Sequence, residues 1–134
     1  LYNVLVIHGV IAFSVARSIR TVPGFFGRVA YQVGPFTLTL DDIEHGVMRR
    51  NRRNLMGLRQ FSPKDPRTTL LPSRLEPRIH FALVCASQSC PAIAFYEAAR
   101  LDGQLEVASK NYLRTTIEPM EETRELWLPA LLRY

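Results

Sequence analysis

The sequence has 134 residues and a formal net charge of +5, with 15 arginines and 2 lysines. That length suits one domain with a single core and excludes two such cores, so residues 1–134 are treated as one domain. The moderate positive charge specifies no partner by itself, and arginine in place of lysine is typical of a GC-rich genome. The partner therefore stays unknown at this level.

The first segment, Leu1 to Ala16, predicts a buried helix that ends before the breaker Thr21–Gly24. It contains Asn3 and His8, lacks a basic leader and is interrupted by Gly9. No transmembrane segment is therefore expected. The apolar positions at roughly helical spacing are Val4, Leu5, Ile7, Ile11 and Val15.

Apolar alternation on both sides of Gly34–Pro35 predicts a β-hairpin within "RVAYQVGPFTLTL". Each strand places three apolar side chains on one face: Val29, Tyr31 and Val33 on the first strand, and Phe36, Leu38 and Leu40 on the second. After the hairpin, Asp41 and Glu44 have the spacing of a capping box, which predicts a short helix from Asp42 to about Arg50.

From Asn51 to Pro77 the chain has four prolines and few periodic apolar positions, which predicts a long surface loop. The next segment, "RIHFALVC" at residues 78–85, is apolar on both faces and predicts a central, covered strand. An amphipathic pattern at residues 96–116 predicts a helix packed on the sheet. A last hairpin is expected with its turn at residues 120–123, followed by a helical turn from Pro129.

These elements predict an α+β fold, in which a small, mostly antiparallel sheet is covered by helices. The chain starts and stops inside apolar segments, so we expect a single domain that is truncated at both ends.

The candidate chemistry lies in "HFALVCASQSCPAI", residues 80–93, which contains both cysteines of the chain. If a helix began at Pro91, Cys90 would be its N-cap, and the helix dipole would activate the thiol as a nucleophile. If residues 91–95 are extended, that argument fails. Such a nucleophile needs a base, and polar-flanked His45 beside Glu44 is the best candidate, whereas His8 and His80 have apolar neighbours and fit structural roles.

Two other interpretations of the cysteines remain open. Cys85 and Cys90 could join a histidine or two in a zinc site, but one Cys-x4-Cys pair is a weak signal, so no cofactor is predicted. A Cys85–Cys90 disulfide would close a small loop and remove the free thiol.

Five arginines form a basic cluster around the end of the predicted 42–50 helix. Such a cluster can hold phosphate or an acidic partner. No aromatic residues are interleaved with it and it matches no nucleic-acid motif, so a solvated surface is the simpler interpretation. The cluster consists of Arg49, Arg50, Arg52, Arg53 and Arg59.

Several blocks together resemble the uncharacterised family known as domain of unknown function 547. They are "LYNVLVIHGVI", "VAYQVGPFTLTLDDIEHGVMRRNR", "DPRTTLLP", "EPRIHFALVCASQSCPAIAFYEAARLDGQLEVASKNYL" and "LPALLRY". The resemblance implies an exported or envelope-associated setting for bacterial members, but no established activity. By position, the family's motif residues fall on Tyr2, Asn3, His8, Asp42, Glu44, His45, Arg78, His80, Phe81, Cys85, Ser89, Cys90 and Pro91.

Two functional hypotheses follow from these residues. The first is a cysteine-dependent hydrolase or acyl transferase, in which Cys90 is the nucleophile, His45 the base, Glu44 its orienting group and Ser89 an oxyanion donor. The second is a non-catalytic module that binds a ligand or a protein, in which the Cys85–Cys90 pair is structural. The ligand-binding candidates are His80, Cys85, Asn3 and Arg49.

Overall fold

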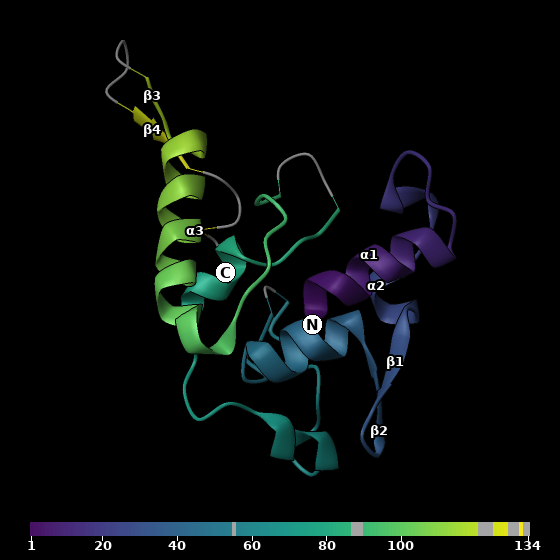
Figure 1. The fold of residues 1–134 in the computed structure, drawn as a ribbon. Coiled ribbons are helices and arrows are strands. Elements are labelled where there is room, and N and C mark those ends of the chain that lie inside the picture. Colours follow the sequence, from purple (N-terminus) through teal and green to yellow (C-terminus); the bar gives the residue numbers. More distant parts are fainter. Residues whose placement is uncertain (55, 87–89, 121–124, 129–131, 133–134) are drawn as a thin grey trace.

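The structure, a computed structural model, describes residues 1–54, 56–86, 90–120, 125–128 and 132. As predicted, it is an α+β domain with small antiparallel sheets (Figure 1). Its helices are α1 (Tyr2–Ala12), α2 (Phe25–Arg28) and α3 (Leu101–Thr116), and its strands are β1 (Ala30–Val33), β2 (Phe36–Thr39), β3 (Glu118–Met120) and β4 (Glu125–Trp127). The 3₁₀ helices are η1 (Ile19–Thr21), η3 (Pro66–Leu70), η4 (Pro77–Phe81) and η5 (Ala98–Arg100), and η2 (Asp42–Met48) is a π-helix.

The predicted first hairpin is confirmed. Strands β1 and β2 pair antiparallel, with Val33 opposite Phe36 across the turn. The turn needs a left-handed backbone at Gly34, whose φ is +57°, and glycine adopts this conformation at little cost. Leu38 and Leu40 are buried on the predicted face, 2% and 0% exposed. The hairpin therefore contributes one wall of the core.

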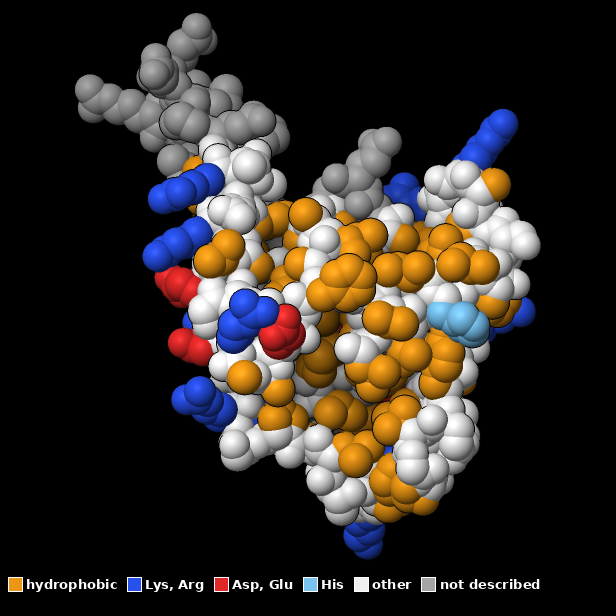
Figure 2. Space-filling view, viewed as in Figure 1, with side chains coloured by type: hydrophobic (Ala, Val, Ile, Leu, Met, Phe, Trp, Pro, Cys, Tyr) orange, Lys and Arg blue, Asp and Glu red, His pale blue; other side chains and the backbone are white. Residues whose placement is uncertain are grey.

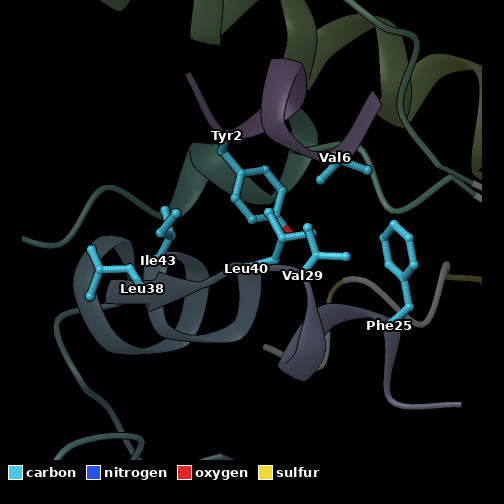
Figure 3. Close-up of a cluster of buried hydrophobic side chains, with 7 residues drawn as sticks. All are labelled: Tyr2, Val6, Phe25, Val29, Leu38, Leu40 and Ile43. Carbon is cyan, nitrogen blue, oxygen red and sulfur yellow. The ribbon is translucent and has the colours of Figure 1, made fainter. Parts of the chain in front are cut away.

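The core lies where α1 crosses the hairpin, α2 and the start of η2. Figure 3 shows side chains from these elements converging on one another. The close approach of α1 depends on Gly9, because a Cβ there would lie 3.0 Å from Phe25 Cζ and from Val29 Cγ1. The buried cluster consists of Tyr2, Val6, Phe25, Val29, Leu38, Leu40 and Ile43.

The helix at the N-terminus is confirmed, but its buried face differs from the predicted one. The buried positions are Tyr2, Val6 and Gly9. Val4 and Ile11, which the spacing placed in the core, are 51% and 69% exposed. The helix is apolar on all sides, so its periodicity could not indicate which face packs. In Figure 2 hydrophobic side chains spread across the face between α1 and α3.

The predicted cap of the 42–50 helix is wrong. Asp41 has helical backbone angles and makes no capping hydrogen bond. Instead, Thr39 Oγ1 accepts from the Asp42 amide at 3.0 Å, and an Asp42 carboxylate oxygen accepts from the Thr39 amide at 3.0 Å. This is the reciprocal pattern of a capping box, two residues earlier than predicted. The helix has a π-helical register, in which Arg49 N donates to Glu44 O.

The predicted strand at residues 78–85 is also wrong. Its first half is the 3₁₀ turn η4, which Pro77 begins and the Glu76 side chain caps by accepting from Arg78 N. Proline at the first helical position pre-sets the turn. Ala82 and Val84 are buried, but this segment pairs with no strand among the described residues.

The predicted long helix is confirmed as α3, but it begins at Leu101 instead of residue 96, and its main packing partner is η4 instead of a sheet; it buries Leu105 and Tyr112. The tilted ring pair Phe81–Tyr112, with centroids 5.6 Å apart, is part of this contact. The last hairpin is confirmed by the antiparallel pairing of β3 with β4. Its connecting residues 121–124 and most of the expected final turn from Pro129 lie outside the described residues.

Candidate functional site

Glu44 and Tyr2 join η2 to α1 through one hydrogen bond. The Tyr2 hydroxyl donates to Glu44 Oε2 at 2.7 Å. Burial, and then the charge of Glu44, raises the pKa of Tyr2 far above its usual range, so the phenol stays a neutral donor. This hydrogen bond fixes the position of Glu44. The sequence analysis did not pair Glu44 with Tyr2.

His45 on η2 is held by Arg49, the C-cap residue of this helix. An Arg49 guanidinium nitrogen lies 3.0 Å from His45 Nδ1, and because arginine can only donate, Nδ1 is the acceptor when this hydrogen bond is made. Glu44 Oε1 lies 3.9 Å from the same Nδ1, beyond hydrogen-bond length. Glu44 therefore makes no orienting hydrogen bond to this nitrogen of His45.

His80 on η4 is half-buried and faces the same group. Burial lowers its pKa, the charges of Arg49 and His45 lower it further, and Glu44 opposes the shift. The structure thus brings together Glu44, His45, Arg49 and His80. The strand predicted at residues 78–85 hid this proximity, because it placed His80 in the middle of a sheet.

Asn3 joins α1 to the segment that leads to the cysteines through two hydrogen bonds. Its Nδ2 donates to Ala82 O at 2.9 Å, and its Oδ1 accepts from Val84 N at 3.1 Å. One amide thereby supplies the donor and the acceptor that a neighbouring strand would supply. His8 likewise has a structural partner, the Tyr31 hydroxyl, 2.8 Å from its Nδ1.

Cys85 and Cys90 are joined by a disulfide, with their Cα atoms 6.0 Å apart. A disulfide sulfur is not a thiolate, so nucleophilic attack by Cys90 would require the reduced protein. Of the two alternatives for Pro91, the structure has no helix that begins there: residues 91–97 have no regular secondary structure and α3 begins only at Leu101. The dipole argument therefore fails. Ser89 lies outside the described residues.

Cys90 and His45 line different cavities. Cys90 borders a groove of about 1000 Å³ between α3 and the coil at residues 90–97. His45 borders a smaller cavity of about 310 Å³ beside the loop that follows η2. The predicted set is thus divided, with Glu44, His45, Arg49 and His80 grouped together and the cysteines elsewhere.

The groove, of about 1000 Å³, is larger than the cavity of about 310 Å³ beside His45, and its walls are mostly apolar. In Figure 1 the coil at residues 90–97 runs beside α3. Sequence analysis missed this site because the coil's apolar residues, such as Ile93 and Phe95, follow no helical or strand period. The main apolar and aromatic residues of the walls are Phe81, Pro91, Phe95, Tyr96, Val107 and Tyr112.

Among the described residues there is neither a metal-binding group nor a membrane-spanning helix. In this part of the chain, no group of three or more His, Cys, Asp or Glu side chains is arranged so that it could hold a metal ion. Within the same part of the chain, no helix combines the length and apolar character that a bilayer crossing needs.

The chain folds into a small α+β domain. Hydrogen bonds from its motif residues join α1 to η2 and to the segment that contains the cysteines. The family model described as "Protein of unknown function, DUF547" matches residues 1–113. The chain therefore belongs to this family, as the sequence blocks predicted. Searches of curated proteins and of solved structures found no match.

Proposed function

We propose that this domain is a non-catalytic binding module that holds an extended apolar peptide of a partner protein. The observation that carries the proposal is the groove of about 1000 Å³ beside α3, with its apolar walls. Phe95 and Val107, which line it, are 80% and 57% exposed. Large exposed apolar surfaces of this kind are typical of interaction sites.

The backbone of the groove's outer wall indicates a peptide as the occupant. Residues 91–96 make no backbone–backbone hydrogen bond with any other described residue. An occupant that excludes water from the groove must satisfy these amides and carbonyls, or their desolvation opposes binding. A hydrocarbon chain cannot do so, whereas an extended peptide pairs with them while its side chains enter the groove.

The outer wall is held at both ends, which lowers the entropic cost of binding. At one end Cys90 is bonded to Cys85, next to Val84, whose amide donates to Asn3. At the other end Gln104 donates to Phe95 O at 3.1 Å and accepts from Glu97 N at 2.8 Å. A wall fixed in this way favours binding because less freedom is lost on association.

The disulfide supports the non-catalytic alternative over cysteine-dependent hydrolysis. The hydrolase hypothesis needs a free Cys90 thiolate within reach of a histidine. In this structure the Cys90 sulfur is bonded and His45 lines another cavity. The structural role of the Cys85–Cys90 pair is therefore part of the proposed function.

The test compares two end-blocked heptapeptides of alternating leucine and serine, one of them methylated at alternate backbone nitrogens. We expect the unmethylated peptide to bind at least about tenfold more tightly in fluorescence anisotropy, because methylation removes several hydrogen-bond donors. Val107→Glu, at an exposed groove position, should weaken binding by about tenfold or more because it brings a charge to an apolar wall.

The matched control is Arg114→Gln, an exposed substitution on α3 outside the groove with the same change in net charge. It should leave peptide binding unchanged. Equal binding of the two peptides would contradict the proposal, as would equal effects of Val107→Glu and Arg114→Gln. Tight binding of dodecanoate but not of either peptide would identify a lipid site instead.

A further inference from the structure

A second cavity, of about 310 Å³, lies between the C-terminal half of η2 and the loop that follows it. It shares no lining residue with the groove beside α3. Its volume is at the lower end of the range that binds small molecules. The described lining residues are His45, Arg49, Arg52, Asn54, Met56, Leu58 and Gln60.

The charge of this lining has one sign. Arg49 and Arg52 contribute two guanidinium groups, and no Asp or Glu is among the described lining residues. Arg49 is only 7% exposed and lies 3.0 Å from His45, so its side chain is held in place. Arg52 is exposed, and its side chain makes no hydrogen bond or ion pair with any described residue.

The conformation of the loop leaves the NH₂ group of Asn54 available as a further hydrogen-bond donor. Asn54 Oδ1 accepts from the amides of Met56 and Leu58, at 3.0 and 2.9 Å. Its carbonyl oxygen is thereby used, whereas its NH₂ group makes no hydrogen bond within the described part of the chain. Protein donors without protein acceptors favour an anionic ligand.

We propose that this cavity binds a small organic anion, a carboxylate or phosphate attached to a short apolar group. The Arg52 guanidinium and the Asn54 amide donate to the anion, while Arg49 adds positive potential from a fixed position. The apolar side chains of Met56 and Leu58 contact the remainder of the ligand. The ligand class thus follows from the presence of basic and apolar side chains in the same lining.

The experiment titrates the folded domain with phenyl phosphate, benzoate and inorganic phosphate by calorimetry at low salt. We expect phenyl phosphate or benzoate to bind more tightly than inorganic phosphate, because only the organic anions contact the apolar wall. Whichever of the two binds more tightly identifies the anionic group. No binding of either organic anion at millimolar concentration would overturn the proposal.

Two variants with the same change in charge distinguish binding at a specific site from nonspecific attraction of anions to the positively charged protein. Arg52→Gln should weaken binding by about tenfold, since it removes a charge-assisted hydrogen bond. Arg50→Gln carries the same charge change at an exposed neighbouring position outside the cavity, and should alter binding by less than about twofold. Equal losses would overturn the proposal. Val107→Glu, which tests the peptide groove, should leave anion binding unchanged.

Discussion

At the scale of single residues, two asparagines satisfy backbone groups that neither helix nor strand satisfies. Asn51 Nδ2 donates to Phe61 O at 2.9 Å, and Asn51 Oδ1 accepts from Phe61 N at 2.8 Å. Asn3 likewise makes hydrogen bonds to the backbone of Ala82 and Val84, which are 79 and 81 positions away in the sequence. Buried backbone groups need partners, so these two side chains substitute for missing strand neighbours.

His80 makes the stability of the domain depend on pH. Burial lowers its pKa in the folded state, so just below the ordinary histidine value the unfolded chain binds more protons than the folded one. Stability should therefore fall as the pH is lowered through that window. In thermal melts between about pH 7.5 and 5.5, the wild-type midpoint should fall more steeply than that of His80→Gln. His8 and His45 are common to both proteins, so parallel slopes would contradict the assignment to His80.

At the scale of elements, two residues are candidates for the N-terminal cap of η2, and substitutions can distinguish between them. Thr39→Val keeps a β-branched side chain in β2 but removes the hydroxyl that accepts from Asp42 N. We expect it to lower the free energy of unfolding by about 1 kcal/mol in urea titration. Asp41→Ala should cost less, because Asp41 makes no capping hydrogen bond. A larger loss for Asp41→Ala would restore the cap that the sequence predicted.

Local sequence patterns predicted the elements whose signals are local. The hairpin at Gly34 and the amphipathic helix α3 were both predicted, because turn chemistry and apolar period are properties of a few neighbouring residues. The segment at residues 78–85 was predicted wrongly, because its apolar alternation reflects packing of a 3₁₀ turn and a coil. Proline at position 77 was the local signal for that turn.

The candidate site was only partly predictable for the same reason. Glu44 and His45 lie on η2, and Arg49 is the residue that caps its C-terminus, so their proximity follows from helical spacing. Tyr2 and His80 join them only through tertiary contacts, which no spacing in the sequence encodes. The hydrogen bonds of Asn3 likewise join residues that are far apart in the sequence.

At the scale of the whole molecule, the domain has two packing regions. One is the core of α1, the hairpin, α2 and η2; the other is the packing of α3 on η4. Arg78 strengthens the second region, since it pairs with Glu76 at 2.8 Å and with Asp102 at 2.6 Å. These contacts lower the pKa of Glu76 to about 2, chiefly through hydrogen bonds from Arg78. The coil at residues 90–97 leads from the disulfide to η5 and α3, and its residues 90–92 and 94–96 line the groove.

Removal of the disulfide should therefore affect the groove more than the core. The bond closes a loop across a sequence separation of 5 residues, and a loop of that size gives about 2 kcal/mol of stability in the chain-entropy model. We expect the double variant Cys85→Ala with Cys90→Ala to lose about that much in urea titration. It should also bind the alternating leucine–serine peptide more weakly, while binding of phenyl phosphate stays unchanged.

The matched measurement is the wild-type protein with and without a reducing agent. Reduction should reproduce the loss of peptide binding, because it frees the end of the wall at Cys90 from Cys85. Unchanged stability and peptide binding would show that the bond does not hold the groove. Esterase activity that appears on reduction and disappears in Cys90→Ser would instead support the nucleophile hypothesis, because only a free thiolate can attack an acyl carbon.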